Sequence, residues 1–357
     1  MLYSSVKNIN IQKMSVALPT TKKPVTDFNE VFGEDVVRKF SDMTGVKSYH
    51  RANMNQTASD LGFEAARKIF ESEPFDKRKI KFLVFVTQKP DFRSPSTAFL
   101  LHKRLGLEED CMCFDLNLAC SGFIYGLHVI SSLLESATEG DQALLITGDT
   151  SYRTYSPLDR TLIMLFGDSG TATLLEKSKT DATLQFALRT DGSKFKSIVT
   201  PSGAYRNMGA ERERVAWNDG IERSDYDTHM KGMDVFGFSI TDVPKLLKDF
   251  LKYTETPVED YDILALHQAN LYILKQISRK LKAPMEKIPV ALDRFGNNSS
   301  NSVPLAIADH YGGIEDKSNK RILMSGFGAG LSWGCCDAVL SPDVVLPLYF
   351  TDKAYEG

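Results

Sequence analysis

An internal duplication constrains the fold of this chain more than any other feature of its sequence. Asp115 and Asp293 lie 178 residues apart, and so do Gly148 and Gly326. Both times a short apolar run precedes the Asp, and a polar loop, a helical stretch and a second apolar run lead to the Gly. Repetition at a fixed spacing and in a fixed order indicates two copies of one structural unit.

The repeated unit combines strands with helices. Nearly continuous apolar runs are typical of strands that are buried on both faces. Such runs occupy residues 81–87, 111–114, 142–147, 171–175, 262–266, 289–292 and 321–324. Apolar residues at helical spacing mark 60–70 and 244–253. We therefore expect an α/β fold made of two modules, at residues 1–178 and 179–357, packed into one layered body.

Composition excludes several classes of protein. A net charge of −3 creates no field that would attract nucleic acid or an anionic membrane. No apolar run approaches the ~18 residues that span a bilayer, and the N-terminal residues lack the apolar core of a signal peptide. Five cysteines are an odd number and indicate a reducing compartment rather than a disulfide scaffold. The sequence thus predicts a cytoplasmic globular protein without a membrane span or nucleic-acid partner.

Residues 191–233 depart from the repeated pattern. The segment carries scattered charge, few apolar residues and no sustained period. A long irregular connection inside a compact domain is often a functional loop or a lid. A disordered surface insertion would have the same composition, so both interpretations stay open.

Cys120 is the first candidate for chemistry. It lies where an apolar run that ends near Phe114 gives way to an apolar helical stretch. The start of a helix presents unpaired N–H groups and the positive end of the dipole, which would lower the pKa of a thiol placed there. A cysteine beside an apolar helix can also be a small buried hydrophobic residue.

His267 and Asn297 are the second and third candidates. His267 follows the run 262–266 directly, at the strand end where α/β proteins place their functional residues. It could equally be a buried core or interface histidine. Asn297 and Asn298 lie in a polar turn before a helix, where either a helix cap or a site residue fits. Because Asn298 lies 178 residues after Cys120, a pseudo-twofold relation would bring these two helix starts into one site.

The glycine-rich segment 326–330 allows backbone N–H groups to approach a ligand closely. Together with the N–H of Cys120, it could form an oxyanion hole for a thioester carbonyl. It is not a phosphate-binding loop, because no Gly-Lys-Ser/Thr sequence follows.

These motifs together resemble those of β-ketoacyl-acyl-carrier-protein synthase III of the thiolase superfamily. The resemblance extends over nearly the whole chain and rests on segments that occur in the family's order: 115–125, 167–170, 191–192, 267–270, 296–302 and 327–330. It implies a duplicated, five-layered αβαβα thiolase-like fold, a homodimer and a triad of Cys120, His267 and Asn297.

The resemblance also implies a mechanism. The Cys120 thiolate would take the acyl group from a thioester, while the N–H groups of Cys120 and Ala329 hold the oxyanion. His267 and Asn297 would then donate hydrogen bonds to the carbonyl of a malonyl thioester. Its decarboxylation would yield the enolate that attacks the acyl group. No metal or redox cofactor is implied, because the departing CO₂ generates the carbanion.

The remaining positions concern substrates and partners. Arg160 and Asn270 match substrate-binding positions of the family, and Arg279 and Lys280 match basic positions that dock an acyl carrier protein. Ser94 stands where the family has an aromatic residue that gates the partner subunit's acyl pocket, which leaves room for a longer or bulkier acyl group.

Three other positions depart from the family. Lys39 and Met43 replace the Trp and Arg that clamp CoA, and Tyr272 replaces a basic residue. The donor could thus be an acyl-CoA or an acyl-carrier protein, with malonyl-carrier protein as the second substrate.

Several functions remain possible from the sequence. The main hypothesis is a decarboxylating synthase of fatty-acid or related lipid biosynthesis. A close variant serves specialised lipid or polyketide synthesis. A thiol hydrolase would use Cys, His and Asn in the same order along the chain, and a non-catalytic scaffold could keep the fold.

Overall fold

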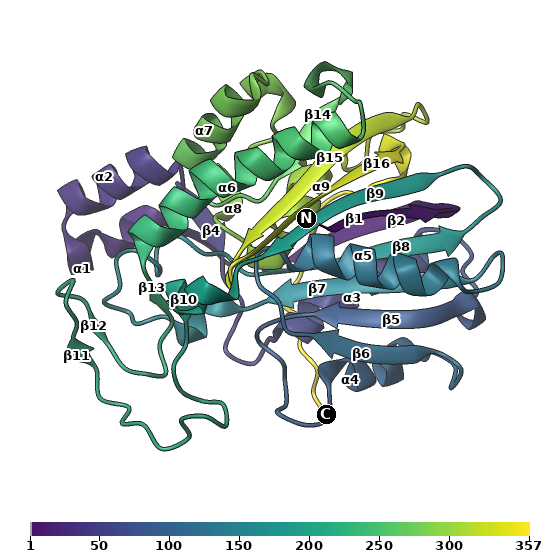
Figure 1. Cartoon of the computed structure of the whole chain (residues 1–357). Coiled ribbons are helices and arrows are strands. Elements are labelled where there is room, and N and C mark those ends of the chain that lie inside the picture. The colour runs from purple at the N-terminus through teal and green to yellow at the C-terminus, as the bar shows by residue number, and fades with distance from the viewer. Residues whose placement is uncertain (1) are drawn as a thin grey trace.

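The computed structural model describes residues 2–357, which form two large β-sheets (Figure 1). The first sheet has the strand order β17 (Tyr349–Phe350), β2 (Ile9–Leu18), β8 (Ser169–Lys177), β7 (Gln142–Asp149), β5 (Ile80–Val86) and β6 (Met112–Leu116). The second sheet has the order β1 (Leu2–Lys7), β9 (Thr183–Thr190), β16 (Ser332–Leu340), β15 (Lys320–Gly328) and β14 (Ile263–Leu266).

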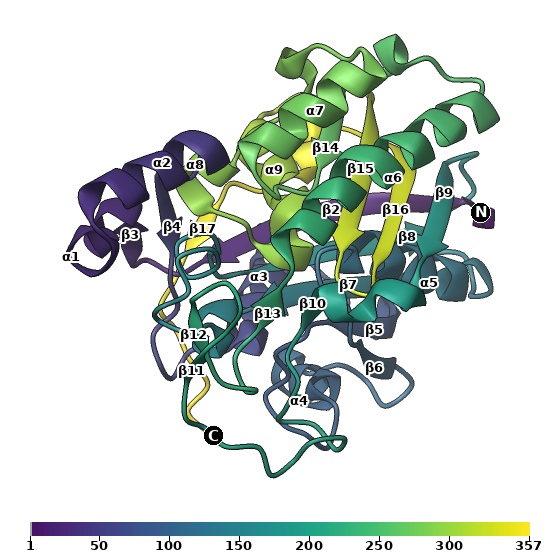
Figure 2. The ribbon, with the colours of Figure 1, turned by 60° about the vertical axis from the view of Figure 1, so that its left-hand side comes forward.

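Helices enclose and separate the two sheets, as Figures 1 and 2 show from two directions. On the outer face of the first sheet lie α3 (Ala58–Ser72) and α4 (Thr97–Leu105). The helices α5 (Gly122–Glu135) and α9 (Ser302–Tyr311) lie between the sheets and contact strands of both. Outside the second sheet, α6 (Gly232–Tyr253) packs with α7 (Leu271–Leu281). The five-layered αβαβα architecture is therefore confirmed.

Shorter elements complete the structure. The helices α1 (Asn29–Phe32), α2 (Glu34–Thr44) and α8 (Leu292–Phe295) flank the two-stranded ribbon of β3 (Lys22–Pro24) and β4 (Ser48–His50). Two further ribbons pair β10 (Ile198–Val199) with β13 (His229–Met230) and β11 (Val215–Ala216) with β12 (Glu222–Arg223). No helix among residues 2–357 has the length and apolar character needed to cross a membrane.

The duplication is visible in the strand pairing. β7 is parallel to β5 and antiparallel to β8, and β15 has the same relations to β14 and β16. The repeated glycines occupy these corresponding strands, and both allow a close approach of backbone. A Cβ at Gly148 would lie 2.7 Å from the carbonyl oxygen of Ala58, and one at Gly326 would lie 2.9 Å from that of Cys120. Close packing of strand against neighbouring backbone thus explains both glycines.

The chain ends cross between the modules. β1 belongs to the module 1–178 by sequence but pairs with β9 in the second sheet, and β17 pairs with β2 in the first sheet. A division near residue 178 follows the end of β8, and these two strands pair across it. The division into residues 1–178 and 179–357 stays a prediction.

One predicted strand is wrong. Residues 289–291 are irregular, and Leu292 begins α8. The side chain of the buried Gln268 supplies the hydrogen bonds that a neighbouring strand would make. Its Nε2 donates to the carbonyl of Pro289 at 3.2 Å, and its Oε1 accepts from the N–H of Ala291 at 3.1 Å. The other predicted runs overlap strands β5, β6, β7, β8, β14 and β15, and the two helical stretches fall within α3 and α6.

The segment 191–233 is ordered and attached to the body of the protein. The buried Arg223 pairs with Asp159 at 2.6 Å, and Arg214 pairs with Asp227 at 2.9 Å. The two short ribbons β10–β13 and β11–β12 lie within it. These contacts contradict a disordered insertion, and the functional role of the segment stays a prediction.

Candidate active site

Cys120, His267 and Asn297 line one cavity of about 530 Å³. Cys120 comes from the first half of the chain, and the other two come from the second half. The pseudo-twofold relation that the offset of 178 suggested therefore does bring these chain segments together. The remaining walls of the cavity are mostly apolar.

Cys120 lies in the turn between β6 and α5, immediately before Ser121, the N-cap of the helix. The end of β15 packs directly on it, because a Cβ at Gly328 would lie 2.7 Å from the Cβ of Cys120. Only glycine allows this strand to pass so close. The Cys120 Sγ lies 3.9 Å from the Oγ of Ser299, which follows Asn297 by two residues.

The expectation of a lowered pKa for Cys120 is wrong. Burial raises the pKa of the thiol to about 12, and the charge of Asp149 raises it further, while the hydrogen bond with Ser299 lowers it. The desolvation of a buried thiolate outweighs the stabilisation that a helix start provides. The resting side chain is therefore a neutral thiol at neutral pH.

His267 directly follows β14, where its N–H donates to the carbonyl of Ser325 at 2.8 Å. The ring packs edge-on against Phe327, with 5.1 Å between the ring centroids. Burial lowers the pKa of His267 to about 3, against an opposing contact with the Ser299 carbonyl. The Nδ1 atom is buried and has no hydrogen-bond partner in the described part of the chain. The ring is therefore neutral across the physiological range.

Asn297 is fixed by both its backbone and its side chain. Its N–H donates to Leu165 at 2.9 Å, and its carbonyl accepts from Gly167 at 3.0 Å. The Oδ1 atom accepts from the N–H of Ser299 at 2.9 Å. The Nδ2 amide is therefore the end of the side chain that remains to donate to a substrate. Asn298, its neighbour, instead donates to the carbonyl of Phe295 at 2.8 Å and holds the turn.

Two predicted substrate-binding residues, Arg160 and Asn270, also line the cavity. Asn270 is the N-cap of α7 and accepts from the N–H of Ile273 at 2.7 Å. Lys39, Met43 and Tyr272 lie at the same cavity, and Met43 is 63% exposed. The positions where the chain departs from the family thus face the predicted site.

The other predicted residues lie elsewhere. Ser94 is on an exposed loop between β5 and α4, and Arg279 and Lys280 are exposed in the last turn of α7. Ala329 directly follows β15, and its carbonyl accepts from the Ser332 hydroxyl at 2.9 Å. Its assignment to an oxyanion hole and the roles of the three exposed residues stay predictions.

Two polar residues near Cys120, Ser299 and Asp149, carry no catalytic role in the predicted triad. Ser299 follows Asn297 by two residues and adopts a φ of +50°, a strained conformation for a residue with a side chain. Asp149 ends β7 and is buried. A polar residue at the end of a buried strand is the signal that identified His267, and it would also have identified Asp149.

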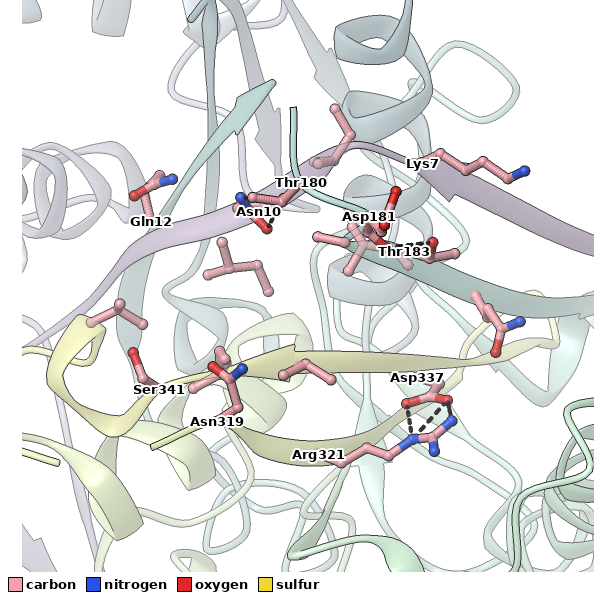
Figure 3. Close-up of a pocket in the computed structure, with 18 of the residues that line it drawn as sticks. Lys7, Asn10, Gln12, Thr180, Asp181, Thr183, Asn319, Arg321, Asp337 and Ser341 are labelled. Carbon is pink, nitrogen blue, oxygen red and sulfur yellow. Dashed lines mark hydrogen bonds and ion pairs between the residues drawn. The ribbon is translucent and has the colours of Figure 1, made fainter. Parts of the chain in front are cut away.

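A second cavity, of about 870 Å³, is lined by parts of β1, β2, β9, β15 and β16 (Figure 3). Its Arg321 and Asp337 form an ion pair of 2.6 Å, so these charges compensate each other. The predicted triad lines the smaller cavity.

Comparisons with known proteins agree with this geometry. A family model for 3-oxoacyl-[acyl-carrier-protein] synthase III matches residues 114–192, and a model for the C-terminal part of that enzyme matches 251–338. A putative 3-oxoacyl-[acyl-carrier-protein] synthase 3 of Campylobacter jejuni is 31% identical over 333 residues, covering 91% of this chain and 92% of its own. The β-ketoacyl-[acyl-carrier-protein] synthase III of Xanthomonas campestris is 34% identical and covers 82% of this chain and 86% of its own.

Solved structures show the same likeness. The crystal structure of a 3-oxoacyl-(acyl-carrier protein) synthase from Burkholderia xenovorans superposes with a TM-score of 0.90 at 30% identity. The superposition covers 98% of this chain and 99% of that one.

Proposed function

The chain belongs to the 3-oxoacyl-[acyl-carrier-protein] synthase III family of condensing acyltransferases, and from this membership we propose that Cys120, His267 and Asn297 are its catalytic residues. The observation that supports the proposal is their position around one cavity, although they come from different halves of the chain. A nucleophile and neutral hydrogen-bond donors at one cavity are the groups that this condensation requires.

In the first half-reaction, Cys120 attacks the carbonyl of an acyl thioester. The new sulfur–carbon bond forms while the bond to the donor thiol breaks, and the acyl group remains on Cys120. The N–H groups of Cys120 and Ala329 stabilise the oxyanion. Each such donor contributes about 10²–10³ in rate in other acyl-transfer enzymes.

In the second half-reaction, a malonyl thioester enters beside acyl-Cys120. His267 and Asn297 donate hydrogen bonds to its thioester carbonyl, and the enolate that forms on loss of CO₂ attacks the acyl carbon. A His267 ring with a pKa of about 3 supports this role, because it stays neutral and donates without transferring its proton. We assign the reaction no metal or redox cofactor, since decarboxylation itself generates the carbanion.

We next propose which residues bind the acyl donor and the carrier protein. Arg160 and Asn270 line the cavity, which supports their proposed role in binding the thioester substrate. Arg279 and Lys280 carry positive charge in the last turn of α7. Tyr272, in the first turn of the same helix, lines the cavity. An acidic acyl carrier protein fits that surface, and malonyl-carrier protein is the proposed second substrate.

The apolar rim favours one variant of this function. Met43 and Tyr272 are 63% and 48% exposed at the mouth of the cavity, where the family resemblance predicts basic residues. Loss of the CoA-clamping Arg at Met43 weakens CoA binding and favours an acyl-carrier protein as donor. Tyr272 replaces a basic residue of the carrier-protein patch and weakens that patch, where Arg279 and Lys280 remain. A synthase of specialised lipid or polyketide formation is the corresponding second candidate.

Assembly and location are also proposals. β6 pairs with β5 along one edge and ends the described sheet on the other, which supports a homodimer formed across this edge. Ser94 would then face the partner's cavity. All five cysteines are free, which supports a reducing compartment such as the cytoplasm.

Intact-protein mass spectrometry tests the function directly. Wild type and Cys120→Ala are incubated with acyl-CoA and acyl-carrier-protein donors, with and without malonyl-carrier protein. We expect an acyl adduct on wild type alone, discharged as a β-ketoacyl product when malonyl-carrier protein is added. Discharge only to free acid would show a thiol hydrolase, and no adduct from any donor would show a non-catalytic scaffold.

A further inference from the structure

Two exposed positive charges line the active-site cavity. They belong to Lys39 and Arg160, and no aspartate or glutamate lines the cavity in the described part of the chain. Arg160 also forms no ion pair with any other residue of 2–357. An anion that enters the cavity therefore meets a guanidinium whose charge no carboxylate compensates.

The position of Arg160 is set by the backbone of its turn, because its guanidinium has no hydrogen-bond partner among the described residues. Asp159 organises this turn. Its Oδ1 accepts from the N–H of Thr161 at 2.9 Å and from the Thr161 hydroxyl at 2.6 Å. Its carbonyl accepts from the N–H of Ile163 at 2.9 Å. Asp159 thus ties together the backbone on the two sides of Arg160.

Asp159 is in turn held by a residue of the segment 191–233. The Nε atom of Arg223 donates to the other carboxylate oxygen of Asp159 at 2.6 Å. The side chains of Arg223 and Asp159 are 4% and 0% exposed. The guanidinium also pairs with Asp219 at 3.0 Å, within the same segment. Arg223 therefore joins the segment to the turn through a buried ion pair.

The same segment forms part of the cavity wall. Ile198 and Met230, which pair between β10 and β13, both line the cavity (Figure 1). Beside Arg223, the carbonyl of Glu222 accepts from the hydroxyl of Ser156 at 2.6 Å. The segment thus contributes one part of the wall through its base and contacts the turn of Arg160 through its middle.

A buried ion pair is weak evidence for stability, because the lost hydration of both charges offsets their attraction. It does restrict geometry, since a planar guanidinium binds a carboxylate in few orientations. The pair between Arg223 and Asp159 is therefore suited to fixing the turn rather than to strengthening the fold.

We infer that Arg223 is a positioning residue, which acts through Asp159 to hold Arg160 at the cavity. Arg223 itself does not line the cavity. The inference deepens the proposed function, on which it rests for the substrate that Arg160 binds. It gives the segment 191–233 a role in binding a donor that carries a phosphate, as acyl-CoA and the phosphopantetheine arm of a carrier protein both do.

Alkylation of Cys120 by a charged and a neutral reagent tests the inference without any thioester. Iodoacetate is an anion and iodoacetamide is neutral, and each forms a carbon–sulfur bond as iodide leaves. Both rates are measured by intact mass at pH 8 and low ionic strength, with Cys120→Ala as the background for the other cysteines. The ratio of the two rates reports the potential in the cavity, because any change in the thiol itself affects both reagents alike.

Loss of the guanidinium should reduce the preference for the anion. Arg160→Ala should lower the ratio of the iodoacetate rate to the iodoacetamide rate about threefold, the order expected for one partly screened charge. Arg223→Gln should lower it about twofold. The variant that combines both changes should equal Arg160→Ala, because Arg223 acts through Arg160.

Arg214→Gln is the matched control. It removes the same charge from the same segment, but Arg214 pairs with Asp227, inside the segment, at 2.9 Å. The ratio should change less than about 1.5-fold, since a distant exposed charge is screened by salt.

A charge-balanced variant serves if Arg223→Gln folds poorly. Asp159→Asn combined with Arg223→Leu keeps the net charge and leaves no unpaired buried charge. The new amide oxygen can still accept from Thr161, while the link to the segment is lost. We expect the ratio to fall about twofold, as in Arg223→Gln. Thermal unfolding of each variant checks the fold.

The outcomes separate the inference from the proposed function. A ratio equal to that of wild type in Arg160→Ala, Arg223→Gln or the charge-balanced variant would overturn the inference, and so would fully additive effects. With a donor that loads wild type, Arg223→Gln should raise KM about fivefold and change kcat less than about twofold. A wild type that shows the expected ratios but takes no acyl group would refute the proposed function alone.

Discussion

The two halves of the molecule place corresponding turns at one cavity but give them different chemistry. The turn before α5 carries Cys120, and the turn before α9 carries Asn297 and Ser299. In the proposed reaction, the first half supplies the nucleophile and the second supplies hydrogen-bond donors, including His267. Duplication thus fixes where the groups meet, and divergence of the side chains fixes what each turn does.

The halves also differ at one sheet edge. In the first sheet β6 pairs with β5, whereas in the second the side chain of Gln268 bonds to residues 289–292 beyond β14. One side chain can therefore replace the hydrogen bonds of a strand where the chain does not continue as one.

Removing the nucleophile of the first half should have the largest effect on activity. Cys120→Ala should lose acyl loading and reduce β-ketoacyl formation by at least about 10⁴-fold, since no other group can carry the acyl chain. The matched control is Cys111→Ala, a buried cysteine next to β6 that faces neither substrate. Loading of Cys120→Ala by any thioester would show that the nucleophile has been assigned wrongly.

Changes in the second half should separate the two half-reactions. His267→Ala and Asn297→Ala should each slow decarboxylation of malonyl-carrier protein by about 10²–10³-fold, because an enolate-stabilising donor is lost. Both variants should still take up the acyl group on Cys120. Acyl loading and CO₂ release are measured on the same samples. An equal loss of both steps would contradict a division of labour between the halves.

The sheet-edge difference predicts a stability effect. Gln268→Leu should lower the free energy of unfolding by about 2 kcal/mol, because buried backbone groups of residues 289–292 lose their partner. Gln142→Leu in the first half removes a more exposed bond to Glu176 and should cost less than about 1 kcal/mol. Urea unfolding of both variants makes the comparison, and equal effects would show that Gln268 does not act as a strand substitute.

The last prediction concerns the pH dependence of stability. His267 has a folded-state pKa of about 3, below the ordinary value of 6.5, so below pH 6.5 the unfolded chain binds a proton that the folded chain excludes. The free energy of unfolding should thus fall with decreasing pH, by up to about 1.4 kcal/mol per unit from this group. Urea titrations at pH 6.5 and 4.5 should show a smaller fall in His267→Asn. An identical fall in both proteins would show that His267 is not buried as a neutral ring.

The common location of the site residues could be predicted from the sequence better than their protonation. An offset between corresponding turns is a property of the chain, so the turns of Cys120 and Asn297 could be related without coordinates. His267 was assigned to the same site from its place after a strand and from the family resemblance. The pKa of Cys120 could not be predicted, because its burial comes from Gly328 and Ser299, which are about two hundred residues away in the sequence.

The wrong strand prediction has a similar origin. The segment 289–292 has the apolar character of a strand, but the distant Gln268 takes its backbone hydrogen bonds. β1 and β17 are short and lie at the chain ends, so no period in the sequence indicates which sheet each strand joins. In each segment, the structure depends on contacts with residues that are distant in the sequence.

The crossing of the chain ends has a consequence for synthesis on the ribosome. β1 is translated well before its partner β9, which begins at Thr183, and β17 pairs with β2 only once Tyr349 and Phe350 are made. The nascent chain therefore carries an unpaired strand edge while most of the first sheet forms beside it. Such edges are sites of aggregation. The N-terminal strand is thus the segment that depends most on protection before the second half emerges.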